Sequence, residues 1–290
     1  MKKVKYFMII IWVMCFTLLM SGCTNDSMDD IEIIVTNYPC EYVARKLYDS
    51  HATISSIFHD GVDINNYKIS KKQKRDFASK DLFIYNGLLE KERNLAVDLL
   101  AINPNLKIID TAYVLETDYS PEELWLNPSS LLMMSQNVRL GLEEYIVSTY
   151  LEKEVDDNYN KLKIELSELD AEYRVAVDST DDKTIIVADS ALKFLEKFGL
   201  NVVCIDTDAS LKDIADASSL IENESVSYII TFKGLDDNDN VKKLLDDYTN
   251  IKKIELHKLE NLTDDERSNG EDYSSLMKDN LELLKKELYQ

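Results

Sequence analysis

The chain has few chain breakers and few basic residues. Its 290 residues include 7 Gly and 4 Pro, too few for the many turns of an all-β sandwich, so helices and strands should fill most of it. There are 33 Lys and Arg against 54 Asp and Glu, and the resulting charge of −21 would repel phosphate backbones, which argues against DNA or RNA as a partner. With 45% hydrophobic residues, the chain has enough apolar material for a packed core.

Motifs for catalysis and for cofactor binding are also missing. The sequence contains no GxGxxG, GxxxxGK[ST], HExxH or GxSxG, and no short-period repeat. No pair of cysteines has CxxC spacing, and Cys40 and Cys204 fall in separate predicted halves, so neither a structural zinc site nor a disulfide is expected. An exported enzyme that used Asp189 and His257 as an acid/base pair would need a nucleophile or cofactor motif that is absent. The prediction is a protein that is not an enzyme.

The N-terminal segment is typical of an exported lipoprotein. Three lysines precede an uncharged apolar run at 7–20, which is short for a transmembrane helix but suits a secretory signal. The run ends in MSGC at 20–23, which resembles a lipobox, although Leu is more usual than Met at its first position. Residues 1–22 would then be a signal peptide, Cys23 would be diacylated, and 23–30 would form a polar tether; the alternative is an uncleaved anchor or a buried thiol. Two acyl chains would hold the protein on the outer face of the cell membrane, and cleavage would take the charge from −21 to −24.

From residue 31 onward, short β-branched runs alternate with longer amphipathic ones, a pattern that predicts parallel βα units. In the first half the expected strands are 31–35, 52–58, 82–85 and 106–109, with helices at 41–50, 71–80 and 90–102. In the second half the expected strands are 184–187, 202–205, 227–232 and 251–256, with helices at 191–198, 211–221, 241–248 and 273–288.

Between these halves, apolar side chains recur every three or four residues from Leu151 to Val177, which indicates one helix of roughly 40 Å. The predicted fold is α/β, with an N-terminal lobe at 31–128, a connecting helical region with a long linker helix at 129–180, and a C-terminal lobe at 181–290. Two such lobes joined by one helix place the carboxyl ends of both parallel sheets at one cleft, where open α/β sheets bind ligands.

Five segments along the mature chain carry a family resemblance. They are GVD at 61–63 with Tyr67, DLFIYNG at 81–87, LWLNP at 124–128, KTIIVAD at 183–189, and LTDDE at 262–266 with YSSLM at 273–277. In this order they resemble motifs of the zinc and manganese substrate-binding lipoproteins of bacterial ABC transporters, some of which are also labelled adhesins.

The resemblance places the metal ligands of that family on Asn65, Glu123, Asp189 and His257, none of which is the usual residue. All four carry an oxygen or nitrogen donor, and this oxygen-rich set favours harder cations than a three-histidine site does, without excluding zinc. Lys233 follows a second-lobe strand and would repel a metal if it pointed into the cleft.

Each candidate ligand also has a purely structural interpretation. Asn65 beside Asn66 fits a turn, and Glu123 fits the first turn of a helix, where a carboxylate compensates the helix dipole. Asp189 fits the N-cap of the helix that follows it, and His257 fits a surface imidazole at a strand end.

The resemblance implies a monomeric lipoprotein that captures a divalent cation, zinc or manganese, between two lobes and passes it to the permease of an ABC transporter. The alternative is a family member that has lost metal binding and acts as a surface lipoprotein for another ligand or a protein partner. The long helix should limit capture to small local closure.

Overall fold

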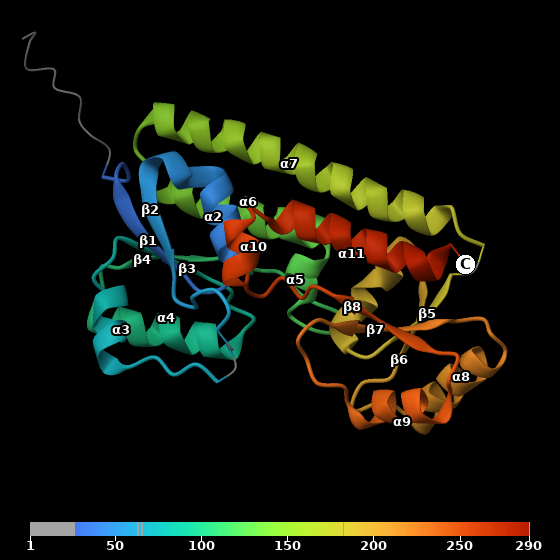
Figure 1. Ribbon diagram of the computed structural model, residues 1–290. Helices are drawn as coiled ribbons and strands as arrows, with labels where there is room; N and C mark the ends of the chain where they lie inside the picture. The colour runs from blue at the N-terminus through green and yellow to red at the C-terminus, as the bar shows by residue number, and fades with distance from the viewer. Residues whose placement is uncertain (1–26, 63, 65, 182, 290) are drawn as a thin grey trace, which may run out of the picture.

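The structure, a computed structural model, describes residues 27–62, 64, 66–181 and 183–289. Two four-stranded sheets with helices around them form two lobes (Figure 1), as the α/β prediction requires. The strand orders are β2-β1-β3-β4 and β6-β5-β7-β8, and all paired strands run parallel. The strands are β1 (Ile31–Val35), β2 (Ala52–Ser56), β3 (Leu82–Tyr85), β4 (Lys107–Asp110), β5 (Thr184–Val187), β6 (Asn201–Cys204), β7 (Tyr228–Phe232) and β8 (Lys252–Leu256).

The strand order fixes where each sheet can present a ligand site. In the first sheet the chain passes from β1 outward to β2 on one side, and from β3 outward to β4 on the other side. The second sheet repeats this order with β5 to β6 and β7 to β8. Such a switch point leaves a crevice beyond the carboxyl ends of the central strands. In the second sheet these ends lead directly to Asp189 and Lys233, and the neighbouring strand β8 leads to His257.

Helices occupy most of the remaining chain. The α-helices are α2 (Tyr38–Tyr48), α3 (Lys71–Phe77), α4 (Glu90–Ile102), α5 (Glu123–Leu126), α6 (Pro128–Tyr145), α7 (Thr149–Asp178), α8 (Leu211–Glu222), α9 (Asp239–Asp247), α10 (Asp264–Ser268) and α11 (Tyr273–Leu288). Two 3-10 helices are η1 (Asp49–His51) and η2 (Ser190–Phe198). Their starts follow local chemistry, because Ser70 with Gln73 and Ser210 with Asp213 form capping boxes that satisfy the first N–H groups of α3 and α8.

The long helix α7 joins the two lobes through their shared core. It has 30 residues, about 45 Å at 1.5 Å per residue, and runs along one side of the molecule (Figure 1). Its buried face contributes to a core that also contains side chains from both sheets, and α6 and α11 pack against it. That face includes Leu151, Val155, Leu162, Leu166, Leu169, Tyr173 and Val177, the residues whose spacing predicts this helix. Two smaller cores lie under α3 and α4 in the first lobe and under α8 and α9 in the second.

The structure differs from the sequence prediction in several short elements. The segment after Asp189 is the 3-10 helix η2 instead of an α-helix, and the second strand ends at Ser56 instead of residue 58. The short helix α10 is not anticipated, whereas α5 begins at Glu123, which fits the first turn of a helix in the sequence. The helical region before residue 180 is two helices separated at 146–148. The starts of η2 and α10 are set by the capping side chains of Asp189 and Thr263 more than by apolar periodicity.

The predicted signal peptide and Cys23 lie outside the described residues. Of the helices in the described part of the chain, none is long and apolar enough to cross a membrane. Cys40 and Cys204 are both free thiols, in agreement with the prediction that they form no disulfide.

Candidate functional site between the lobes

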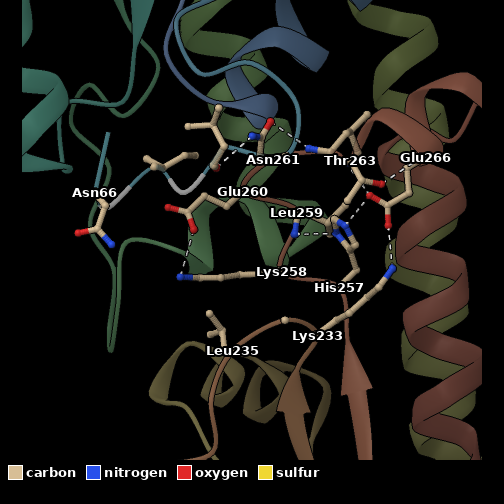
Figure 2. A pocket seen from close by; sticks show the side chains of 15 residues that line it. Asn66, Lys233, Leu235, His257, Lys258, Leu259, Glu260, Asn261, Thr263 and Glu266 are labelled. Carbon is tan, nitrogen blue, oxygen red and sulfur yellow. Dashed lines mark hydrogen bonds and ion pairs between the residues drawn. The ribbon is translucent and has the colours of Figure 1, made fainter. Parts of the chain in front are cut away.

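A cavity of about 590 Å³ lies where the two lobes meet. Its N-lobe wall includes Gly61, Val62, Ile64 and Asn66, and its C-lobe walls are the segments 233–235 and 257–263 together with Glu266 (Figure 2). The loop after β8 also bonds to the N-lobe directly, because Gly61 N–H donates to the Leu262 carbonyl at 2.7 Å. The predicted interlobe cleft is therefore present, at the carboxyl end of the second sheet.

The equivalent crevice of the first sheet is filled by its own side chains. Glu92 on α4 is buried and accepts hydrogen bonds from the Thr36 hydroxyl, the Asn37 side-chain amide at 2.9 Å and Asn86 N–H at 2.8 Å. Burial raises the pKa of Glu92 to about 7, although these donors oppose the shift. The described N-lobe residues that line the interlobe cavity are therefore Gly61, Val62, Ile64 and Asn66.

His257 accepts a hydrogen bond from its own loop. Its Nδ1 receives Leu259 N–H at 2.9 Å, and a backbone N–H is always a donor, so Nδ1 is the unprotonated nitrogen. Burial lowers the pKa of His257, and although Glu266 raises it, the ring is neutral at neutral pH. In that neutral ring Nε2 carries the proton, and it faces Glu266 Oε2 at 3.3 Å. Neither nitrogen has a lone pair to offer a metal until the bond to Leu259 breaks.

The bond from Leu259 supports an unusual backbone conformation. Leu259 is fully buried and has a φ of 60°, in the left-handed region that a leucine seldom adopts. Asn280 on α11 holds the backbone of His257, two residues before Leu259, by accepting from His257 N–H at 2.6 Å and donating to the His257 carbonyl at 2.9 Å. His257 is thus part of the framework of the loop at 257–262.

Lys233 lines the cavity, the orientation that would repel a metal ion. Its charge is balanced there by an ion pair with Glu266. Its ammonium lies 3.0 Å from Glu266 Oε1, while its side chain remains 62% exposed. Burial raises the pKa of Glu266, but Thr263 N–H and Lys233 outweigh this and lower it to about 2. Figure 2 shows Glu266 between His257 and Lys233, so its carboxylate is shared by the two.

Asp189 caps the helix that follows it. Its Oδ1 accepts Ala191 N–H at 2.8 Å, which makes it the N-cap of η2. The structural interpretation of this residue is therefore realised in the structure.

Glu123 is the most enclosed of the candidate ligands. Its side chain is 1% exposed and accepts three backbone N–H groups, from Asp118 at 3.3 Å, from Tyr119, and from Ser120 at 3.0 Å. The Lys197 ammonium lies 3.4 Å from its Oε2. The carboxylate therefore shapes the turn that leads into α5, and its lone pairs are occupied.

The structure does not bring the described candidates together as a ligand group. Among the residues it describes, no three His, Cys, Asp or Glu side chains are placed to hold a metal ion, so Glu123, Asp189 and His257 do not converge. The physical reason is that each of the three is turned toward backbone N–H groups of its own loop. Asn65 lies outside the described residues, and its neighbour Asn66 lines the cavity.

Sequence reasoning missed Lys258, which is central to the cavity. Its ammonium lies 3.2 Å from Glu122 Oε1 and 3.3 Å from Glu260 Oε2, and its carbonyl accepts Trp125 Nε1–H at 2.9 Å. Burial lowers the pKa of Lys258, but Glu260, Glu122 and Asp189 outweigh this and raise it, so the ammonium stays charged. The available signal was a lysine directly after a candidate ligand, with a glutamate two residues further on.

Residues 33–287, nearly the whole chain, match the sequence profile of a family described as the periplasmic zinc-uptake complex component A. The chain belongs to this family. The zinc-binding lipoprotein AdcA of Streptococcus pneumoniae is 21% identical over 98% of the chain and 61% of its own length. The high-affinity zinc uptake system protein ZnuA of Bacillus subtilis is 22% identical over 94% of the chain and 95% of its own length. The chain spans only 55% of other AdcA relatives, so it corresponds to about half of those proteins.

The fold agrees with this membership. The crystal structure of the Zn(II)-bound ZnuA-like domain of Streptococcus pneumoniae AdcA superposes with a TM-score of 0.72 at 21% identity, covering 90% of this chain and all of that domain. The family consists of transport components, which agrees with the prediction that the chain is not an enzyme.

Proposed function

We propose that this chain is the substrate-binding component of an ABC uptake system for a divalent cation, with zinc as its cargo. The observation that carries the proposal is the match to a zinc-uptake family along both lobes, combined with a cavity at their junction. The protein would act as a monomer, perform no covalent chemistry, and present the loaded cleft to a membrane permease.

Cation capture in this cavity requires a local rearrangement. Asn65, Glu123, Asp189 and His257 remain the proposed ligands, and three of them must first release backbone N–H groups. The clearest case is His257, because Nε2 gains a lone pair only when the ring proton moves to Nδ1 and the Leu259 N–H is released. Binding would therefore be coupled to a change in the loop at 257–262.

Calorimetry of metal-stripped protein tests this proposal. We expect one zinc ion per chain at micromolar or tighter affinity, with weaker binding of Mn²⁺, because imidazole suits zinc and the Irving–Williams order favours it. His257→Ala should reduce zinc affinity more than manganese affinity, since it removes the only nitrogen donor of the set. The control is His51→Ala, an imidazole of η1 that pairs with Asp29 and Glu154 and does not line the cavity. Absence of zinc binding by the wild-type protein would overturn the proposal.

We also propose that the protein is a lipoprotein held at the outer face of the cell membrane through Cys23. The lipobox-like MSGC at 20–23 supports this, as does the relative that is itself named a lipoprotein. Cys23→Ser removes the thiol that acylation needs, so the protein should leave the membrane fraction or keep its signal peptide. Normal retention with correct cleavage would contradict the anchor.

A second candidate function has a specific observation in its favour. The described candidate ligands are occupied by backbone N–H groups, and the cavity contains the charged Lys233 and Lys258. The protein would then keep the family fold but bind a different small ligand or a protein partner. Thermal unfolding separates the two candidates. Zinc at 100 times its Kd would stabilise a zinc-binding protein by about 2.7 kcal/mol, whereas it would leave the stability of a protein without a zinc site unchanged.

A further inference from the structure

Lys258 is held between the two lobes by contacts to both its backbone and its side chain. Glu122 and Trp125 belong to the region that begins α5, whereas Glu260 belongs to the loop after β8. The Glu260 carbonyl also accepts Tyr38 N–H at 3.2 Å, which ties this loop to the first residue of α2. The ammonium therefore bridges two acidic groups, one at the start of α5 and one in the loop after β8.

The acidic groups around this ammonium would attract a cation in its absence. Glu122 and Glu260 are in contact with it, and Asp189 adds a third carboxylate whose charge favours it. The Lys258 side chain is only 19% exposed, so these interactions are weakly screened by solvent. Figure 2 shows Lys258 extending toward Glu260, while Lys233 reaches Glu266, so the two lysines serve separate acidic groups.

We propose that Lys258 is the resident cation of the interlobe cavity and sets the affinity of this protein for divalent cations by competing with them. The inference rests on the proposed function and concerns the regulation of the same site. An ammonium keeps its carboxylate partners about 3.2 to 3.3 Å away, as observed here, whereas a zinc ion needs oxygen donors at about 2.0–2.2 Å. A divalent cation that takes Glu122 or Glu260 as a donor in addition to the ligands proposed above must therefore first displace the side chain of Lys258.

The backbone at this position need not move when the side chain leaves. Trp125 Nε1–H holds the Lys258 carbonyl at 2.9 Å, and Trp125 is fully buried. Replacing the lysine with an uncharged residue of similar length should thus leave the loop in place and leave Glu122 and Glu260 without their cation.

The test compares Lys258→Gln with wild type by calorimetry of metal-stripped protein titrated with zinc. We expect the variant to bind zinc at least 10-fold more tightly, a difference of about 1.4 kcal/mol. Lys258→Arg keeps a cation at the site and should bind no more tightly than wild type. Lys233→Gln makes the same charge change in the same cavity and should give a gain well below 10-fold.

The outcomes separate this inference from the proposed function. If wild type and Lys258→Gln bind zinc equally, or if Lys233→Gln gives the same gain, the competing role of Lys258 is overturned while cation capture stands. If only Lys258→Gln binds, the inference holds and cation capture by the native protein fails. If neither binds, both fail. Should Lys258→Gln be unfolded without metal, recovery of its circular dichroism spectrum by zinc supports the inference, and failure to recover overturns it.

Discussion

At the scale of single residues, the described candidate ligands share one behaviour. Glu123, Asp189 and His257 each accept an N–H from a residue within five positions of themselves. An acceptor at the carboxyl end of a strand can either coordinate a cation or satisfy the unpaired N–H groups of the loop that it begins. The same residue types serve both purposes, so their identity alone cannot decide between them.

Glu123→Gln tests the loop-shaping role at the most enclosed of these positions. The variant keeps the shape of the side chain but replaces one accepting oxygen with a donor that faces backbone N–H groups. We expect the free energy of unfolding to fall by about 1–3 kcal/mol in metal-free buffer, measured by urea denaturation. Glu168→Gln, at an exposed position of α7, is the control and should change it by less than 0.5 kcal/mol. Unchanged metal-free stability with a loss of zinc affinity would instead identify Glu123 as a ligand.

The sequence predicts which residues meet the interlobe region better than it predicts what they do there. Asp189, Lys233 and His257 all follow strands of one parallel sheet, and their arrival at its carboxyl edge follows from the alternation of strands and helices alone. Whether their side chains turn outward or toward their own loops depends on backbone geometry such as the positive φ of Leu259. A leucine in the sequence does not indicate a positive φ, because glycine and asparagine are the residues that usually adopt that conformation.

At the scale of elements, apolar periodicity determines the long helix and the strands. The predicted stripe from Leu151 to Val177 matches the buried face of α7, and all eight predicted strands occur in the order expected. The helices α5 and α10 have four and five residues and are too short to show a period, so only the first turn of α5, at Glu123, is anticipated. The N-terminal start of α10 is defined by a different signal, the capping box between Thr263 and Glu266. This box also positions Glu266 at the cavity.

The buried face of α7 should carry most of the stabilising contribution of this helix. Leu166 is 1% exposed and Ile164, two residues before it, is 60% exposed. Leu166→Ala should lower the free energy of unfolding by about 2–5 kcal/mol, because it leaves a cavity in the shared core of both lobes. Ile164→Ala is the matched control on the same helix and should change stability by less than 0.5 kcal/mol. Equal losses in guanidinium unfolding would show that the helix is buried on a different face.

At the scale of the whole molecule, a second connection joins the lobes in addition to α7. Arg267 on α10 contacts the buried Glu41 on α2 through two nitrogens, each at 3.1 Å, and also binds Asp60 in the loop after β2. Asn261 donates to the His59 carbonyl at 2.7 Å on the same side. These contacts hold the N-lobe loop at 59–62 against the C-terminal segment, next to the cavity. They would thereby restrict the rearrangement that cation capture requires.

Arg267→Gln should loosen this connection without disturbing either sheet. The change leaves Glu41 paired only with Arg45 and removes both contacts to Asp60, because glutamine is shorter and uncharged. Arg267 is partly exposed, so solvent screening reduces the cost, and we expect a loss of about 1–3 kcal/mol that acts locally. In native-state hydrogen exchange, the Gly61 amide, which donates to the Leu262 carbonyl, should exchange at least 10-fold faster, while amides of β5 and β7 keep their wild-type rates.

Lys212→Gln provides the control for that experiment, since it breaks an exposed ion pair with Asp216 on α8, far from the interlobe loop in the fold. Its Gly61 amide should exchange at the wild-type rate, because a surface pair of this kind contributes little to stability. If Arg267→Gln also leaves the Gly61 rate unchanged, the backbone bond to Leu262 and the contact from Asn261 hold the lobes together without it. If instead the whole second sheet exchanges faster, α10 stabilises the C-lobe itself, and the contact is not a connection between lobes.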